Sequence, residues 1–169
     1  MGALMFFYED VLRGLADARI DYVLVGGTAV ILQGVPRTTA DLDIVPSLDP
    51  DNLTRLVGKL TELGYKARAP VDPLALADPE QRRVWLEEKG MLAFSFWRPD
   101  RPLDAVDVLY AGRVGYPELR AAALPMDIAG LRLLVASPRD LIEMKRGTGR
   151  AQDAFDINAL ERLIHAQRR

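Results

Sequence analysis

Asp41 and Asp43, which are separated by a single residue, are the side chains of this sequence best placed to act together chemically. They open an apolar run that predicts a strand, and residues two apart on a strand face the same side. Two such carboxylates repel each other unless a cation lies between them, and their hard oxygen atoms suit Mg²⁺ or Mn²⁺. The pair therefore predicts a divalent-metal site. The alternative is two solvated residues on a half-exposed strand.

A glycine pair, Gly26 and Gly27, lies upstream, after the apolar run 22–25 and before a short apolar segment, 28–33, that predicts a helix. Glycines let backbone N–H groups approach a phosphate, and the helix that follows points its positive end at the same anion. Alone, the pair would more often be a tight turn. With the aspartates downstream, we interpret Gly26, Gly27 and Thr28 as nucleotide-binding residues.

A third carboxylate would complete a two-metal site. Asp107 lies between Val106 and Val108 in a predicted strand, where an unpaired charge is costly. Asp104, three residues earlier, falls on the opposite strand face and is the rival candidate. We favour Asp107 as metal ligand and proton acceptor, with a buried structural ion pair as the alternative.

Basic residues are candidates for contacts with phosphate. Arg37 lies in a loop close to the aspartates, where it could contact phosphate or acceptor. Lys145 ends a predicted helix, so an exposed lysine that complements the helix dipole is the competing interpretation. Downstream, we expect Asp153 to form an exposed pair with Arg150 and leave the role of Asp156 open. The cluster of basic residues around this helix end favours an anionic binding partner such as a tRNA terminus; it consists of Arg139, Lys145, Arg146 and Arg150.

The elements that must position these residues alternate between helix and strand. The clearest helix follows Asp49, a predicted N-cap, and ends before Gly64. Strands are predicted over 91–97 and 103–110, and helices over 4–15, 138–145 and 152–166. We expect an α/β fold with a mixed β-sheet flanked by helices, as a single domain over 1–169. A catalytic core would occupy 1–110, and a mainly helical C-terminal extension with one short strand would occupy 111–169.

Composition narrows the possible functions. The sequence has no cysteine and one histidine, His165, which excludes a disulfide scaffold, a thiolate zinc site and a cysteine nucleophile. The formal charge of -2 gives no overall basic surface for nucleic acid. The apolar N-terminal residues carry no basic segment, so we predict neither a signal peptide nor a membrane partner, and a cytoplasmic protein.

The glycine pair, the spacer and the Asp-x-Asp sequence together resemble the nucleotidyltransferase superfamily of DNA polymerase beta. The stretch from Arg37 to Asp43, and the later segments 141–145 and 149–157, resemble small bacterial nucleotidyltransferases related to AbiEii-type toxins. The resemblance implies that Asp41, Asp43 and Asp107 hold Mg²⁺ or Mn²⁺ and that Lys145 serves a nucleoside triphosphate.

The function implied is metal-dependent transfer of a nucleoside monophosphate (NMP) from a nucleoside triphosphate (NTP) such as ATP to an acceptor hydroxyl, with release of pyrophosphate. The acceptor would be tRNA or protein, and the chain would have a cognate partner in a toxin–antitoxin pair. Two alternatives stay open. One is a non-catalytic interaction module of such a pair, and the other is an antibiotic nucleotidyltransferase acting on an aminoglycoside or lincosamide.

Overall fold

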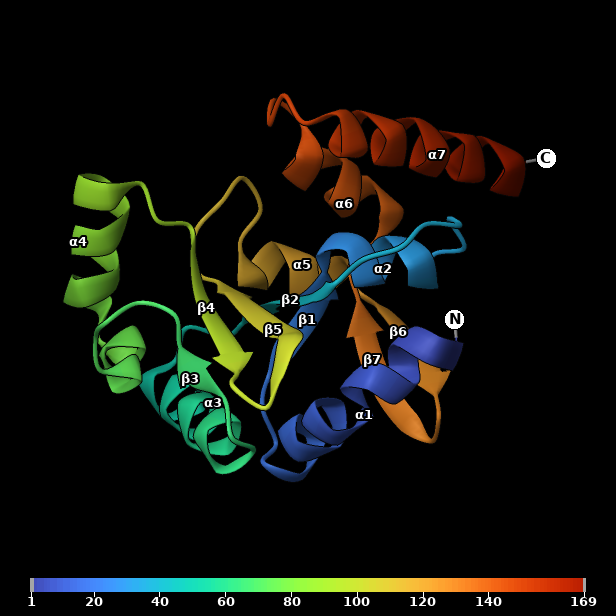
Figure 1. Cartoon of the computed structure of the whole chain (residues 1–169). Coiled ribbons are helices and arrows are strands. Elements are labelled where there is room, and N and C mark those ends of the chain that lie inside the picture. Colours follow the sequence, from blue (N-terminus) through green and yellow to red (C-terminus); the bar gives the residue numbers. More distant parts are fainter. Residues whose placement is uncertain (1, 169) are drawn as a thin grey trace.

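The computed structural model describes residues 2–168, with side chains from residue 7 onward, and shows one central sheet covered by helices (Figure 1). The side chain of Leu4, which belongs to the first predicted helix, lies outside the described residues. The elements follow one another in this order: α1 (Gly2–Asp17), β1 (Tyr22–Val25), α2 (Gly26–Leu32), β2 (Asp41–Pro46), α3 (Pro50–Glu62), β3 (Lys66–Ala67), η1 (Pro73–Ala77), α4 (Pro79–Lys89), β4 (Ala93–Arg98), β5 (Arg101–Leu109), α5 (Tyr116–Ala122), β6 (Leu124–Ile128), β7 (Leu131–Val135), α6 (Pro138–Lys145) and α7 (Ala151–Gln167).

The sheet has the strand order β3-β4-β5-β2-β1-β7-β6. The pairs β2–β5 and β1–β7 are parallel and the other neighbours are antiparallel, so the sheet is mixed. This confirms the predicted α/β fold with helices on its flanks. The parallel pairing of β2 with β5 sets Asp43 directly beside Asp107.

The segment after residue 110 differs from the expectation of one short strand and two helices. It contains α5 and two strands, β6 and β7, which form an antiparallel hairpin. Gly130, at a φ of 76°, lies in the tight turn between them, and such a turn requires this backbone conformation. The hairpin extends the sheet because β7 pairs with β1. After the hairpin, the described chain forms α6 and α7 (Figure 1).

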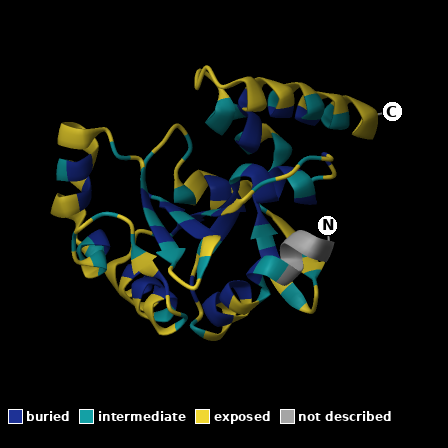
Figure 2. Ribbon diagram, viewed as in Figure 1, coloured by how far each residue is buried: buried dark blue, intermediate teal, exposed yellow. Residues whose placement is uncertain are grey.

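The core lies between the sheet and the inner faces of the helices that cover it, α1 and α3 as well as α2, α5 and α6 (Figure 2). Helix α3 follows the prediction closely, because the Asp49 carboxylate accepts hydrogen bonds from the N–H groups of Asp51 (3.0 Å) and Asn52 (3.2 Å). Its apolar stripe, including Leu56 and Leu60, is fully buried. Helix α6 begins in a similar way, with the Asp140 N–H donating to the Ser137 hydroxyl at 3.2 Å. Among the helices of residues 2–168, none is long and apolar enough to cross a membrane.

Candidate active site

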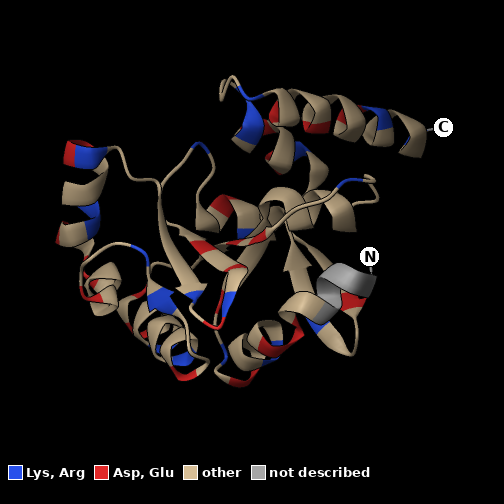
Figure 3. Cartoon of the chain, in the orientation of Figure 1, with Lys and Arg blue, Asp and Glu red and all other residues tan. Residues whose placement is uncertain are grey.

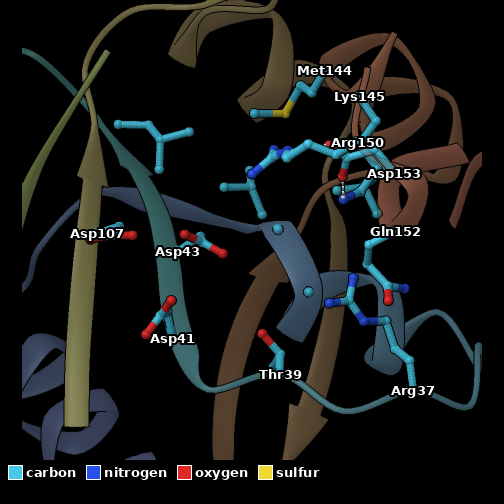
Figure 4. Close-up of a pocket in the computed structure, with 15 residues that line it drawn as sticks. Arg37, Thr39, Asp41, Asp43, Asp107, Met144, Lys145, Arg150, Gln152 and Asp153 are labelled. Atoms are coloured by element: carbon cyan, nitrogen blue, oxygen red, sulfur yellow. Dashed lines mark hydrogen bonds and ion pairs between the residues drawn. The ribbon is translucent and has the colours of Figure 1, made fainter. Parts of the chain in front are cut away.

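Three carboxylates meet on one face of the two central parallel strands. Asp41 and Asp43 come from β2, Asp107 comes from β5, and all three line one open cavity of about 290 Å³ (Figure 4). The intervening residues of β2, Leu42 and Ile44, face the opposite side and are fully buried in the core. The strand alternation expected from the sequence therefore places these carboxylates together.

Burial, together with the crowding of the carboxylates, opposes ionisation of Asp43 and Asp41. Burial, followed by the charges of Asp107 and Asp41, raises the pKa of Asp43 from 3.8 to about 7. Burial and the Asp107 charge also raise the pKa of Asp41. Asp107 is held by the Ser95 hydroxyl of β4, which donates to its carboxylate at 2.6 Å. A cation among the three carboxylates would offset their mutual repulsion, which adds to the effect of burial on the pKa values of Asp41 and Asp43.

Asp104, the rival of Asp107, has a different environment. Its side chain is fully buried away from the cavity, where it accepts a hydrogen bond from the Tyr65 hydroxyl. The Arg101 guanidinium lies 3.7 Å from its other oxygen. Asp104 is therefore a buried structural carboxylate that Tyr65 and Arg101 hold, whereas Asp107 faces the cavity.

Both glycines are required by close packing against the protein's own side chains. Gly26 has a φ of 64°, and a Cβ atom there would lie 2.0 Å from the Asp43 Oδ2 atom. A Cβ atom on Gly27 would lie 2.5 Å from the Thr39 hydroxyl oxygen. Backbone hydrogen bonding from Gly27 also reaches the Asp43 carboxylate. The glycine pair therefore allows the start of α2 to approach both β2 and the loop before it.

Thr28, which the sequence predicts to bind nucleotide, lies outside the cavity. It is buried and does not line the cavity, and its hydroxyl is 3.5 Å from the Asp41 carbonyl oxygen. The reason is that α2 begins at Gly26 instead of after Gly27, which turns the third residue of the helix into the core. The prediction that Thr28 binds nucleotide is not supported by this position.

A cationic wall faces the carboxylates across the cavity; we use this name for Arg37, Lys145 and Arg150 (Figure 4). Lys145 Nζ lies 2.8 Å from an oxygen of Asp153 and 2.9 Å from an oxygen of Asp156. Figure 3 shows the same separation on a larger scale, with acidic residues on the central strands and basic residues at the junction of α6 and α7.

The two aspartates of α7 hold this wall in place. Asp156 is fully buried and pairs with both Lys145 and Arg37, and Asp153 pairs with Lys145 and Arg150. Burial opposes ionisation of Asp153, but hydrogen bonds from Lys145 and Thr148 outweigh it and lower its pKa. The predicted pair of Asp153 with Arg150 is present, but the prediction that Asp153 is exposed is wrong. The competing interpretation of Lys145 as an exposed lysine at a helix end does not hold either, because its side chain is 11% exposed. Because α7 packs across α6, its inward face meets the lysine.

Several residues that line the cavity or support it were not singled out by sequence reasoning. Thr39 and Gln152 line the cavity, and Ser95 holds Asp107. The spacing Arg37-x-Thr39-x-Asp41 gave a signal for Thr39. Ser95 gave none, because its position depends on the register of β4 against β5, which pairs it with Asp107.

The residues fit a divalent cation that is shared with a nucleotide. Within residues 2–168, no three carboxylate or imidazole side chains already surround a single point as a closed metal cage. Mg²⁺ is commonly bound by one or two carboxylates together with substrate phosphates. Asp41, Asp43 and Asp107, two of them with raised pKa values, provide carboxylates of this kind beside an open cavity.

The sequence matches the model of a known protein family. A family model described as "Nucleotidyltransferase of unknown function (DUF6036)" matches residues 5–105. None of the curated proteins matches the sequence.

Solved structures share the fold at low sequence identity. The lincomycin-bound lincosamide antibiotic adenylyltransferase LnuA is 16% identical with a TM-score of 0.62, and the match covers 96% of this chain and 98% of that one. ANT(2")-Ia in complex with adenylyl-2"-tobramycin is 14% identical with a TM-score of 0.57, covering 98% and 97%. An antigenic nucleotidyltransferase-like protein from Paracoccidioides brasiliensis is 20% identical with a TM-score of 0.54, covering 92% and 72%.

Proposed function

We propose that this chain, which belongs to the DUF6036 family of nucleotidyltransferases, transfers an NMP from an NTP to a hydroxyl group of a small-molecule acceptor and releases pyrophosphate. The observation that carries the proposal is the two-sided cavity. Asp41, Asp43 and Asp107 form one side, and the cationic wall forms the other. A triphosphate bound between a metal site and fixed cations needs this separation of charge.

The cationic wall keeps a positive charge for the phosphates. Three cations, Arg37, Lys145 and Arg150, share two carboxylates, which leaves one net positive charge in the group. An ammonium group has three donors, so Lys145 retains one after its two ion pairs. We assign this remaining donor of Lys145, together with Arg150, to the pyrophosphate that leaves.

The carboxylates would hold Mg²⁺ or Mn²⁺, and the ion would supply positive charge that activates the acceptor hydroxyl and stabilises the phosphate oxygens. The acceptor oxygen attacks the α-phosphorus, and a new P–O bond forms. The bond from the α-phosphorus to the oxygen bridging to the β-phosphorus breaks, and pyrophosphate leaves with that electron pair. Asp107, which Ser95 holds in position, accepts the hydroxyl proton.

A small-molecule acceptor is favoured over tRNA, protein or a toxin–antitoxin partner. LnuA and ANT(2")-Ia, which are of nearly the same length as this chain, were solved with lincomycin and with adenylyl-2"-tobramycin. The basic cluster that suggested an anionic acceptor is already assigned in part to the phosphates of the NTP, since Lys145 and Arg150 belong to the cationic wall and are held by the buried Asp153. The tRNA, protein and toxin-partner expectations have no supporting observation. The 169 residues act as one unit in this proposal, because residues 1–110 supply the carboxylates and 111–169 supply two of the cations.

The test is transfer of label from α-³²P-labelled ATP, GTP, CTP or UTP, with Mg²⁺, to lincomycin or tobramycin, with pyrophosphate release measured in parallel. We expect Mg²⁺-dependent release of pyrophosphate. Asp43→Asn should lower it about 100-fold or more, because a lost metal ligand removes several kcal/mol of transition-state stabilisation. Asp127→Asn is the control, since that side chain is 70% exposed on β6. Full turnover in Asp43→Asn would contradict the proposal.

A further inference from the structure

A second cavity, of about 370 Å³, adjoins the candidate active site. The two cavities share two lining residues, Leu109 and Met144. The second cavity lies between the end of β2, the segment after β5 and the start of α5. Nothing in the transfer reaction described above uses it.

Strand geometry explains why the two cavities differ in character. Residues two apart on a strand share a face, so Val45 follows Asp43 on β2 and Leu109 follows Asp107 on β5. The face of the sheet that carries Asp43 and Asp107 is therefore apolar two residues further along both strands. Two residues of strand span about 7 Å, which places the apolar surface within reach of a molecule bound at Asp107.

The rest of this second cavity is also poor in charge. Tyr116 and Pro117 close it from α5, and Leu48 and Val114 lie at its sides. No lysine or arginine among the described residues lines it. Its one carboxylate, Asp49, is already engaged as the N-cap of α3.

We propose that the second cavity binds an apolar part of the acceptor and so presents the acceptor hydroxyl to Asp107. The inference rests on the proposed function and narrows its substrate class to small alcohols that carry an uncharged apolar group. A polyanion such as RNA finds no cation in this lining, and a polycation finds only a carboxylate that is already hydrogen-bonded.

The direction of the reaction supports the acceptor as occupant instead of the nucleotide. In-line displacement requires the attacking hydroxyl and the leaving pyrophosphate to lie on opposite sides of the α-phosphorus. Lys145 and Arg150, which suit the pyrophosphate, enter from α6 and α7 (Figure 4). The second cavity adjoins the carboxylate side, because Leu109 extends the β5 wall beyond Asp107, and among the described residues Met144 is the one that α6 contributes to it.

Binding of phenyl β-D-glucoside, compared with methyl β-D-glucoside, tests the inference. The two probes carry the same sugar hydroxyls and differ in the apolar group. Protein labelled with ¹³C-methyl methionine reports binding through Met144, whose signal is assigned by its loss in Met144→Leu. We expect phenyl glucoside to shift this signal with about tenfold higher affinity than methyl glucoside, as expected for burial of a phenyl group. The affinity should persist with Mg²⁺ and a saturating non-hydrolysable NTP analogue.

Two variants on different sides of the cavity locate the binding. Leu48→Gln makes its rim polar, and Val114→Trp fills it. Each should weaken phenyl glucoside at least about fivefold without changing the affinity for the NTP analogue. Leu86→Gln is the matched control, because Leu86 is 38% exposed on α4 and Leu48 is 37% exposed. Unchanged affinity in a folded Leu48→Gln or Val114→Trp protein would overturn the inference.

The remaining outcomes separate this inference from the proposed function. If the NTP analogue displaces phenyl glucoside, the nucleoside occupies the cavity, and the acceptor assignment is wrong while the transfer reaction stands. If neither glucoside shifts the Met144 signal at millimolar concentration, the cavity is not an acceptor site. If the NTP analogue and Mg²⁺ fail to bind and no pyrophosphate is released, the proposed function itself fails.

Discussion

Replacing Asp43 by asparagine should stabilise the metal-free protein while abolishing transfer. The carboxylate is partly buried beside Asp41 and Asp107, and these surroundings raise its pKa from 3.8 to about 7. In the unfolded chain the group ionises freely. Between pH 3.8 and about pH 7, the folded state therefore binds more protons than the unfolded state. The free energy of unfolding falls as the pH rises through this range.

The size of the effect follows from the pKa difference. About three pH units, at about 1.4 kcal/mol each, give an upper bound of about 4 kcal/mol for the penalty above pH 7. Asparagine removes the charge but also weakens the hydrogen bond from Gly27, so we expect a net gain of about 1–2 kcal/mol. For a chain of this length, the melting temperature should rise by about 3–6 °C.

Thermal unfolding followed by circular dichroism in EDTA, at pH 8 and at pH 5, measures this difference. The gain in Asp43→Asn should be largest at pH 8 and smaller at pH 5, where the folded wild-type protein already carries the proton on Asp43. Asp127→Asn, on the exposed surface of β6, should show neither the gain nor its pH dependence. Adding Mg²⁺ and an NTP analogue should stabilise the wild-type protein more than the variant.

A different pattern would refute the reasoning. If Asp43→Asn is less stable than the wild type at pH 8, the carboxylate is stabilised by partners that outweigh its repulsion from Asp41 and Asp107. If the gain is the same at both pH values, it does not come from the charge of Asp43. Either result removes the electrostatic argument for a cation at this position.

Two further predictions concern the walls of the candidate active site. Lys145→Ala should lower kcat/KM tens-fold in the pyrophosphate-release assay. It should also lower the free energy of unfolding by about 1–2 kcal/mol, because it leaves Asp156 buried with fewer partners. A loss of stability with unchanged kinetics would limit the lysine to a structural role. Gly26→Ala should lose about 1–3 kcal/mol and most activity, since its Cβ would overlap the Asp43 carboxylate at a positive φ; wild-type stability and turnover would contradict the close packing described for this glycine.

The carboxylate side of the site could be predicted from the sequence because it depends on local rules. Alternation along a strand places Asp41 and Asp43 on one face, and the apolar neighbours of Asp107 mark a central strand. The same local rules predicted α3, whose N-cap, apolar stripe and terminal glycine all lie within 16 residues, from Asp49 to Gly64. The fold class followed from the alternation of such elements.

The parts that the sequence did not predict depend on contacts between distant segments. Asp153 and Asp156 fit a solvated helix face by spacing alone, and they are buried only because α7 packs across α6. Ser95 acquires its contact with Asp107 from the register of β4 against β5. The hairpin of β6 and β7 needs its pairing with β1 to become part of the sheet.

The site is divided between two segments of the chain, and one buried carboxylate joins them. The family match over residues 5–105 contains Asp41, Asp43 and the glycine pair, but it ends before Asp107 and before the lysine of the cationic wall. The buried Asp156 joins the two parts, because it holds both Arg37, from the matched segment, and Lys145, from α6. A change in α7 that moves this carboxylate would therefore displace cations from both segments at once. The C-terminal helices thus position the cationic wall, and under the proposed function a substitution in them should alter nucleotide binding without touching the carboxylates.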